Sequence, residues 1–80
     1  MLLTRTISLL GDTDTQVKAQ IKLASILEDK YKAKNVKKIC QVIPVGDNTV
    51  YSHVVQFDIS KKHLNKFIKD FDLIKVELYN

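Results

Sequence analysis

Two side chains in this sequence, Cys40 and His53, have the chemistry of a nucleophile and a base. Both fall in segments that alternate like strands, on either side of a turn, so we expect them on neighbouring strands of one hairpin. A thiol beside an imidazole is the minimum for a cysteine nucleophile. The pattern provides no group to orient the imidazole and no oxyanion hole. We therefore interpret both as ordinary strand residues and predict that the chain is not an enzyme.

Metal ligands are equally sparse. Asp12 and Asp14 are two carboxylates without further acidic ligands, whereas calcium takes roughly six to eight oxygen atoms. Capping of a helix explains both aspartates. His53 and His63 have no cysteine or carboxylate at the spacing of a zinc site. The sequence therefore predicts neither a metal nor a cofactor.

Hydrophobic periodicity predicts the strands that hold these residues. Alternation predicts strands over 2–10, 36–45 and 50–59, and turn residues at 46–49 join the last two into a hairpin. A two- or four-residue loop would pair Cys40 with Val55, and a three-residue loop would regroup the side chains by face. The buried face of the hairpin therefore stays open. Alternation also predicts a strand over 73–79, whose dry face consists of Ile74, Val76 and Leu78.

Apolar residues at helical spacing predict two helices. The first runs from about residue 13 to residue 34, and the second from Ser60 to Asp72. The predicted core residues of the first helix are Val17, Ile21, Ala24, Leu27 and Tyr31. Those of the second are Leu64, Phe67, Ile68 and Phe71.

The order of elements, strand-helix-strand-strand-helix-strand, defines one α+β domain over residues 1–80. Two right-handed crossovers around a central hairpin predict the ferredoxin-like βαββαβ split sandwich. Its four-stranded antiparallel sheet has the order 4-1-3-2, with both helices on one face. The other face is left to solvent or to a partner.

Two surfaces predict protein binding and self-association. The apolar arc of the first helix extends beyond what one small sheet covers, and it leaves a patch on the helix surface. The predicted strand 73–79 lies at an open sheet edge, where its peptide groups can pair with a neighbour. We therefore expect a partner protein and a homodimer. The predicted interface residues are Ala19, Leu23, Ile26, Lys75, Glu77 and Tyr79.

The chain is mildly basic. Its net charge is +4, and Arg5 is the only arginine among thirteen positive side chains. Because arginine is the usual residue for bidentate phosphate contacts, we favour a solvated lysine surface. A run of lysines that continues from a helix end into a strand can nevertheless follow a phosphate backbone.

A short motif supports that alternative. Tyr51-Ser52-His53-Val54 resembles the aromatic, small, aromatic, aliphatic core of the third-strand signature of RNA-recognition motifs, whose aromatics stack on bases. The sequence departs from the signature at Thr49, Val50 and Gln56, and Ser8 stands where the first strand carries an aromatic. The resemblance implies single-stranded nucleic acid on the open sheet face. The candidate residues are Tyr51, His53, Lys32, Lys34, Lys37 and Lys38.

We interpret the chain as a small non-enzymatic protein-binding or regulatory module that also self-associates. An inhibitor or accessory protein of a larger partner fits this description, and a single-stranded nucleic-acid-binding protein is the alternative. The lone cysteine and the lack of a secretory leader indicate a cytoplasmic protein. No stretch approaches the ~20 apolar residues of a membrane span.

Overall fold

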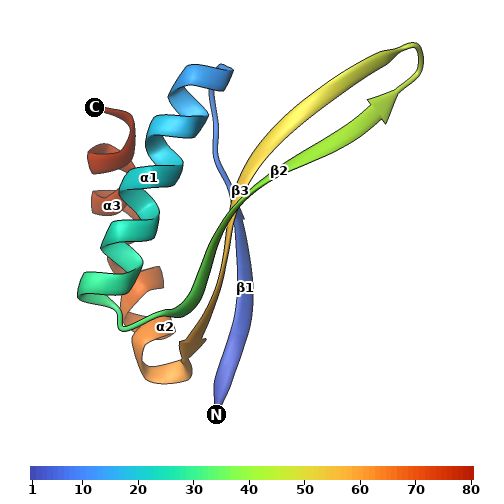
Figure 1. Cartoon of the computed structure of the whole chain (residues 1–80). Helices are drawn as coiled ribbons and strands as arrows, with labels where there is room; N and C mark the ends of the chain where they lie inside the picture. Colours follow the sequence, from blue (N-terminus) through green and yellow to red (C-terminus); the bar gives the residue numbers. More distant parts are fainter.

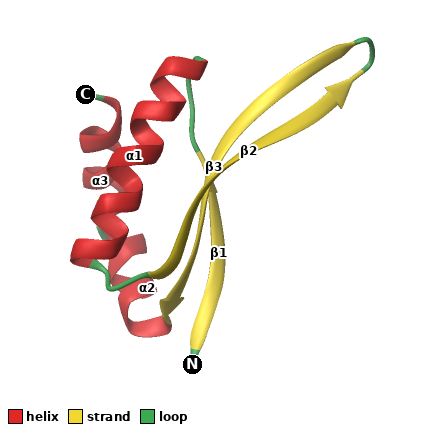
Figure 2. Cartoon of the chain, in the orientation of Figure 1, coloured by secondary structure: helices red, strands yellow, loops and turns green.

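The computed structural model describes residues 1–80 as three strands and three helices (Figures 1 and 2). The strands are β1 (Leu2–Ser8), β2 (Lys34–Val45) and β3 (Asn48–Ser60). The helices are α1 (Thr13–Lys30), α2 (Lys61–Lys69) and α3 (Phe71–Tyr79). The sheet is antiparallel in the order β1-β3-β2, and all three helices lie on one side of it (Figure 1).

The predicted fourth strand is wrong, because residues 71–79 form helix α3. Ile74 and Leu78, four residues apart, are both buried, whereas Val76 between them is 58% exposed. The segment alternates, but its buried residues also have helical spacing. Only Asp70 separates α3 from α2, and the Ile74 N–H donates to the Asp70 carbonyl, so the chain resumes a helix at once. The fold is α+β with three strands, and the order 4-1-3-2 does not apply.

Helix α1 has two covered faces. On one, the buried Gln20 side chain donates to the carbonyls of Ile39 at 3.0 Å and Val54 at 2.8 Å, which ties the helix to β2 and β3. On the other, α1 packs against α3 (Figure 1). Ala19 and Leu23 are fully buried in the same core cluster as the α3 side chains. Ile21, a predicted core residue, is 56% exposed and lines an open hollow together with Glu77 of α3.

Phe67 of α2 lies in the middle of the core. Its ring makes edge-on contacts with Tyr31 at 5.3 Å, Phe57 at 6.2 Å and Phe71 at 5.6 Å between centroids. The core positions predicted for the second helix are therefore right at Phe67 and at the buried Leu64. Ile68 was also predicted in the core, but it is 63% exposed.

The hairpin turns on two residues, Gly46 and Asp47. Gly46 has φ +60°, which a side chain would strain, and it stands at the first central position, where a type II′ turn needs this conformation. Val45 pairs with Asn48, and Cys40 pairs with His53. This register differs by two residues from the Cys40–Val55 pairing considered for a two- or four-residue loop, so the side chains share the faces of that alternative and not those of a three-residue loop.

The distal half of this hairpin, residues 41–52, projects beyond the rest of the molecule, and we call it the arm (Figure 1). Residues 41–51 are all exposed, whereas Val54, Val55, Phe57 and Ile59 farther along β3 are buried. Strand β1 pairs with β3 only from Val54 to Ser60. The arm therefore lacks a third strand, and no helix covers it.

Candidate interaction surfaces

The arm is apolar on both faces. Its helix-side face carries Val42, Pro44 and Tyr51, and the opposite face carries Ile43, Val45 and Val50. The five largest of these apolar side chains are between 43% and 60% exposed. Strands that are apolar on both faces are normally buried on both, and a bare two-stranded hairpin is marginal in water. The arm thus resembles one part of an interface.

The outer edge of β2 is closed to further strands. Because Val45 and Asn48 close a two-residue turn, they form a hydrogen-bonded pair, and the ring nitrogen of Pro44 points away from β3. Proline at that place removes a donor from the free edge. The base of the same strand carries Lys34, Lys37 and Lys38 and a register shift between the first two. Lysines, bulges and proline are the usual devices that prevent strand addition.

The opposite side of the sheet has an open, stepped edge. The Leu9 N–H donates to the His53 carbonyl, so odd-numbered residues of β1 and β3 direct their peptide groups toward each other. The even-numbered residues of β1, Thr4 and Thr6 among them, direct theirs outward. Beyond the end of β1, Tyr51 of β3 likewise has no strand partner on that side. The step consists of a short β1 beside a longer β3, and neither free edge carries lysine, proline or a bulge.

An apolar groove borders the outer edge of β1. It is a hollow of about 370 Å³ between β1 and helices α2 and α3. Leu64 and Phe67 form its floor, and the half-buried Phe71 and exposed Ile68 form its wall. Arg5 and Asp72 are its only charged lining residues. In this structure the Arg5 guanidinium donates to the outward-facing Thr4 carbonyl at 2.9 Å.

Cys40 and His53 are cross-strand partners at the base of the arm, as the sequence predicted for neighbouring strands. Cys40 is exposed. The Gln16 side-chain oxygen accepts from the His53 N–H at 3.0 Å and lies 3.2 Å from its Nδ1. An amide, not a carboxylate, therefore orients the imidazole. This arrangement fixes the position of the strand against α1.

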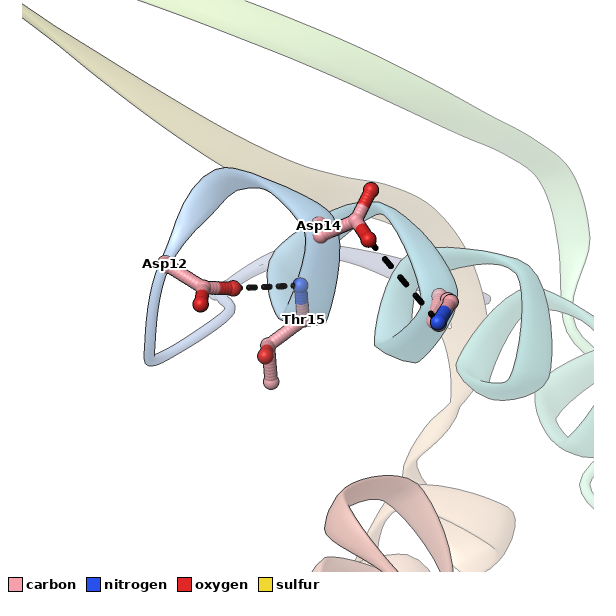
Figure 3. Close-up of polar contacts among 4 residues, drawn as sticks. Asp12, Asp14 and Thr15 are labelled. Atoms are coloured by element: carbon pink, nitrogen blue, oxygen red, sulfur yellow. Dashed lines mark hydrogen bonds and ion pairs between the residues drawn. The ribbon is translucent and has the colours of Figure 1, made fainter.

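The aspartates at the start of α1 serve the helix (Figure 3). Asp12 Oδ1 accepts from the Thr15 N–H at 2.8 Å, and this bond holds the pKa of Asp12 below its usual value. Asp14 lies 3.9 Å from Lys18. The structure brings together no group of three or more histidine, cysteine, aspartate or glutamate side chains that could hold a metal ion.

The interface predicted on the first helix loses its basis, because Ala19 and Leu23 are 0% exposed and Ile26 is half-buried. Their cover is α3 of the same chain. The other three predicted residues lie on α3 instead of an edge strand. Tyr79 accepts from the Leu10 N–H at 2.9 Å, Lys75 lies 3.7 Å from Asp72, and the Glu77 carbonyl accepts from Lys22 at 3.5 Å. The contacts of Tyr79 and Glu77 hold α3 against the rest of the chain, whereas the Lys75–Asp72 pair lies within the helix.

The residues of the predicted nucleic-acid site do not form one surface. Tyr51 pairs with Val42 in the arm, about five residues along β2 from Lys37 and so roughly 16 Å away. Lys37 and Lys38 are adjacent on a strand and point to opposite faces. His53 faces α1, not the open sheet face.

The lysines gather elsewhere. Nine of the twelve lysines lie in residues 30–38 and 61–69, and Lys30 and Lys66 line one hollow. These two segments meet at the end of the molecule opposite the arm (Figure 1). Asp58, close by, accepts hydrogen bonds from Asn35 at 2.8 Å and Thr4 at 2.6 Å, and these bonds lower its pKa. The molecule therefore has a basic end and a nearly uncharged arm.

Comparisons with protein-family models, with curated proteins and with solved structures found no match. None of the three helices is long and apolar enough to cross a membrane. The arm and the groove were not predicted from the sequence. Two signals pointed to the arm, namely the unbroken apolar run Val42–Val45 and the presence of Asp47 as the only formal charge between residues 39 and 57.

Proposed function

We propose that this chain is a non-enzymatic protein-binding module, of the accessory or regulatory kind, whose binding element is the arm. The observation that carries the proposal is the exposure of apolar side chains on both faces of a projecting hairpin. The partner is a protein that offers an apolar surface and an unpaired strand edge. Such strand addition combines main-chain hydrogen bonds with pockets for alternate side chains.

Hydrophobic free energy supports this assignment. The five large apolar side chains of the arm expose roughly 500 Å², equivalent to about 12 kcal/mol of gross transfer free energy at the usual coefficient. The arm is already a paired hairpin, so a partner has less chain entropy to overcome than with a disordered segment. A preformed apolar element of this size can form a stable interface with a partner protein.

The test places a photo-crosslinking amino acid at Ile43 of the full chain in its host cell. The matched control position is Ser25, which is exposed on α1 outside the arm. We expect one discrete adduct from position 43 and none from position 25. An absence of adducts at 43, or the same adducts from both positions, would contradict the proposal.

The basic end favours a second candidate, a nucleic-acid contact that differs from the predicted site. The lysines of residues 30–38 and 61–69 adjoin, so a phosphate backbone has several cations within reach. We expect a single-stranded oligonucleotide to bind weakly and with steep salt dependence. Lys61→Glu with Lys62→Glu should abolish binding, and Lys18→Glu, near the other end of α1, should not. Binding that ignores salt would exclude this candidate.

A further inference from the structure

We propose that the arm's partner is a second copy of this chain, and that two copies join through their stepped edges about a two-fold axis perpendicular to the sheet. This inference rests on the proposed function of the arm. In the dimer, β1 of each copy fills the step beside the other's arm. The result is one continuous sheet with the helices of both copies on the same side.

The shape of the edge carries the first part of the argument. In one chain, β1 covers β3 from Val54 to Ser60 and leaves the arm half of β3 uncovered on the same side. The free edge of β1 and the free edge of the arm therefore face the same direction. A two-fold rotation about an axis at the step places β1 of each copy beside the uncovered arm half of β3 in the other copy. A two-fold interface requires this kind of self-complementarity.

The two edges of the sheet differ in their protection against strand addition. The sheet has two long sides, and the β2 side has lysines, a register shift and Pro44 against strand addition. The stepped side has none of these devices, and its outward peptide groups include those of Thr4, Thr6 and Tyr51. The β2 side is protected against strand addition and the stepped side is not, which indicates that the stepped side is the one that pairs with another strand. The bond from Arg5 to the Thr4 carbonyl is then exchanged for a strand hydrogen bond.

The apolar groove beside β1 also fits this dimer. The axis keeps the helix side of both copies on the same face, so the helix-side residues of one arm lie over the groove beside the other copy's β1. Tyr51 and Val42 are the larger apolar side chains on that face of the arm, and the groove wall consists of Phe71 and Ile68. Two five-residue strand pairings with their side chains in two grooves bury on the order of 1,500 Å², the size of a stable interface.

Charge agrees with this arrangement. Two chains of net charge +4 repel, so a dimer must join where positive charge is scarce. The arm and β1 together contain one acidic residue, Asp47, and one basic residue, Arg5. The half-turn brings the arm tip, with Asp47, to the end of the partner where its N-terminus and the lysines of α2 lie (Figure 1).

Proline substitutions test the pairing by sedimentation equilibrium of the full chain. The Thr49 N–H points to the free edge of β3, so Thr49→Pro removes no bond to β2. We expect the unaltered chain to sediment as a dimer of the 9.2 kDa chain at micromolar concentration and Thr49→Pro to be a folded monomer. Cys40→Pro is the matched control, since it removes an outward N–H from the guarded β2 edge. It should remain dimeric.

Crosslinking provides a second readout that does not depend on a disruptive variant. In a Cys40→Ser background, chains with Thr4→Cys are mixed with chains with Val50→Cys and treated with a short bismaleimide. We expect a mixed 4–50 crosslink, and no crosslink when Ser25→Cys replaces Thr4→Cys. A monomeric unaltered chain, a dimer that survives Thr49→Pro, or a dimer lost equally in Cys40→Pro would overturn the proposal. A position-43 adduct whose mass is not twice the chain's would leave the arm's binding function standing and exclude this partner.

Discussion

Tyr31 joins the end of α1 to the short junction between α2 and α3. Its ring is buried, and its hydroxyl donates to Asp70 Oδ2 at 2.9 Å. Burial and the Asp70 carboxylate raise the pKa of Tyr31 to about 12. The folded chain thus holds the neutral phenol more strongly than the unfolded chain does. The contribution of the Tyr31 phenol to the free energy of unfolding is fully present below the ordinary pKa of 10.0 and is lost as the pH rises toward 12.

Replacing Tyr31 therefore has two expected effects. Tyr31→Phe keeps the ring but removes the hydrogen bond, so the free energy of unfolding at pH 7 should fall by about 1 kcal/mol. The variant should also lose less stability between pH 10 and 12 than the unaltered chain. Urea unfolding at pH 7, 10 and 11.5 measures both. An identical alkaline decline in the two proteins would assign it to other groups.

Gln20 is the only buried polar residue, and its single amide nitrogen serves two strands. Gln20→Ala leaves the Ile39 and Val54 carbonyls without this donor, and we expect a loss of about 1–3 kcal/mol. Gln16→Ala, one helical turn away, removes a less buried amide and should cost less. Equal losses from the two variants would contradict the assigned role of Gln20.

At the scale of elements, the sequence predicted the three strands, both long helical segments and the hairpin, because their periodicities are unambiguous. It failed at residues 73–79, where Ile74 and Leu78 fit both a period of two and a helical turn. The tertiary environment decides such a segment. The apolar arc of α1, interpreted as an intermolecular surface, is what α3 covers, so the two errors have one cause.

The helical assignment of this segment has a direct test. Leu78→Ala should reduce the free energy of unfolding by about 2–4 kcal/mol, because it leaves a cavity between α3 and α1. Val76→Ala should change it by less than about 0.5 kcal/mol, since that side chain is largely exposed in a helix. A strand would bury both residues on one face. Comparable losses of stability in the two variants would support a strand over residues 73–79 instead of a helix.

The arm is separable from the rest of the fold. Only its base contacts α1, through the bonds to His53 and Val54, and residues 41–51 are exposed. A chain in which Asn-Gly joins Val42 directly to Tyr51 should fold, with a melting temperature within a few degrees of that of the monomeric Thr49→Pro chain. Circular dichroism and NMR measure this. Global unfolding would show that the arm is part of the folding core.

At the scale of the whole molecule, the sequence predicted self-association for reasons that the fold removes. The surfaces now proposed, the arm and the stepped edge, arise from strand lengths and from the pairing of β1 with half of β3. No single residue carries that information, because relative strand lengths appear only when the register is known. The groove is similarly a product of how α2 and α3 lie against β1.

A dimer should also govern thermal stability. Because association stabilises only the folded chain, the melting temperature should rise by several degrees when protein concentration increases about a hundredfold. Thr49→Pro should melt at one temperature over the same range. Scanning calorimetry at two concentrations distinguishes them, and a concentration-independent unaltered chain would count against the dimer.

Pro44 has a consequence for the solution behaviour of every copy. A chain with a bare edge on each side of its sheet could add neighbours without limit, in the manner of a fibril. With the β2 side blocked, growth through the stepped edge stops at two. Pro44→Val keeps the apolar run and restores the missing donor. We expect that variant to form thioflavin-positive aggregates at concentrations where the unaltered chain stays clear, so that a single ring nitrogen separates a closed pair from a polymer.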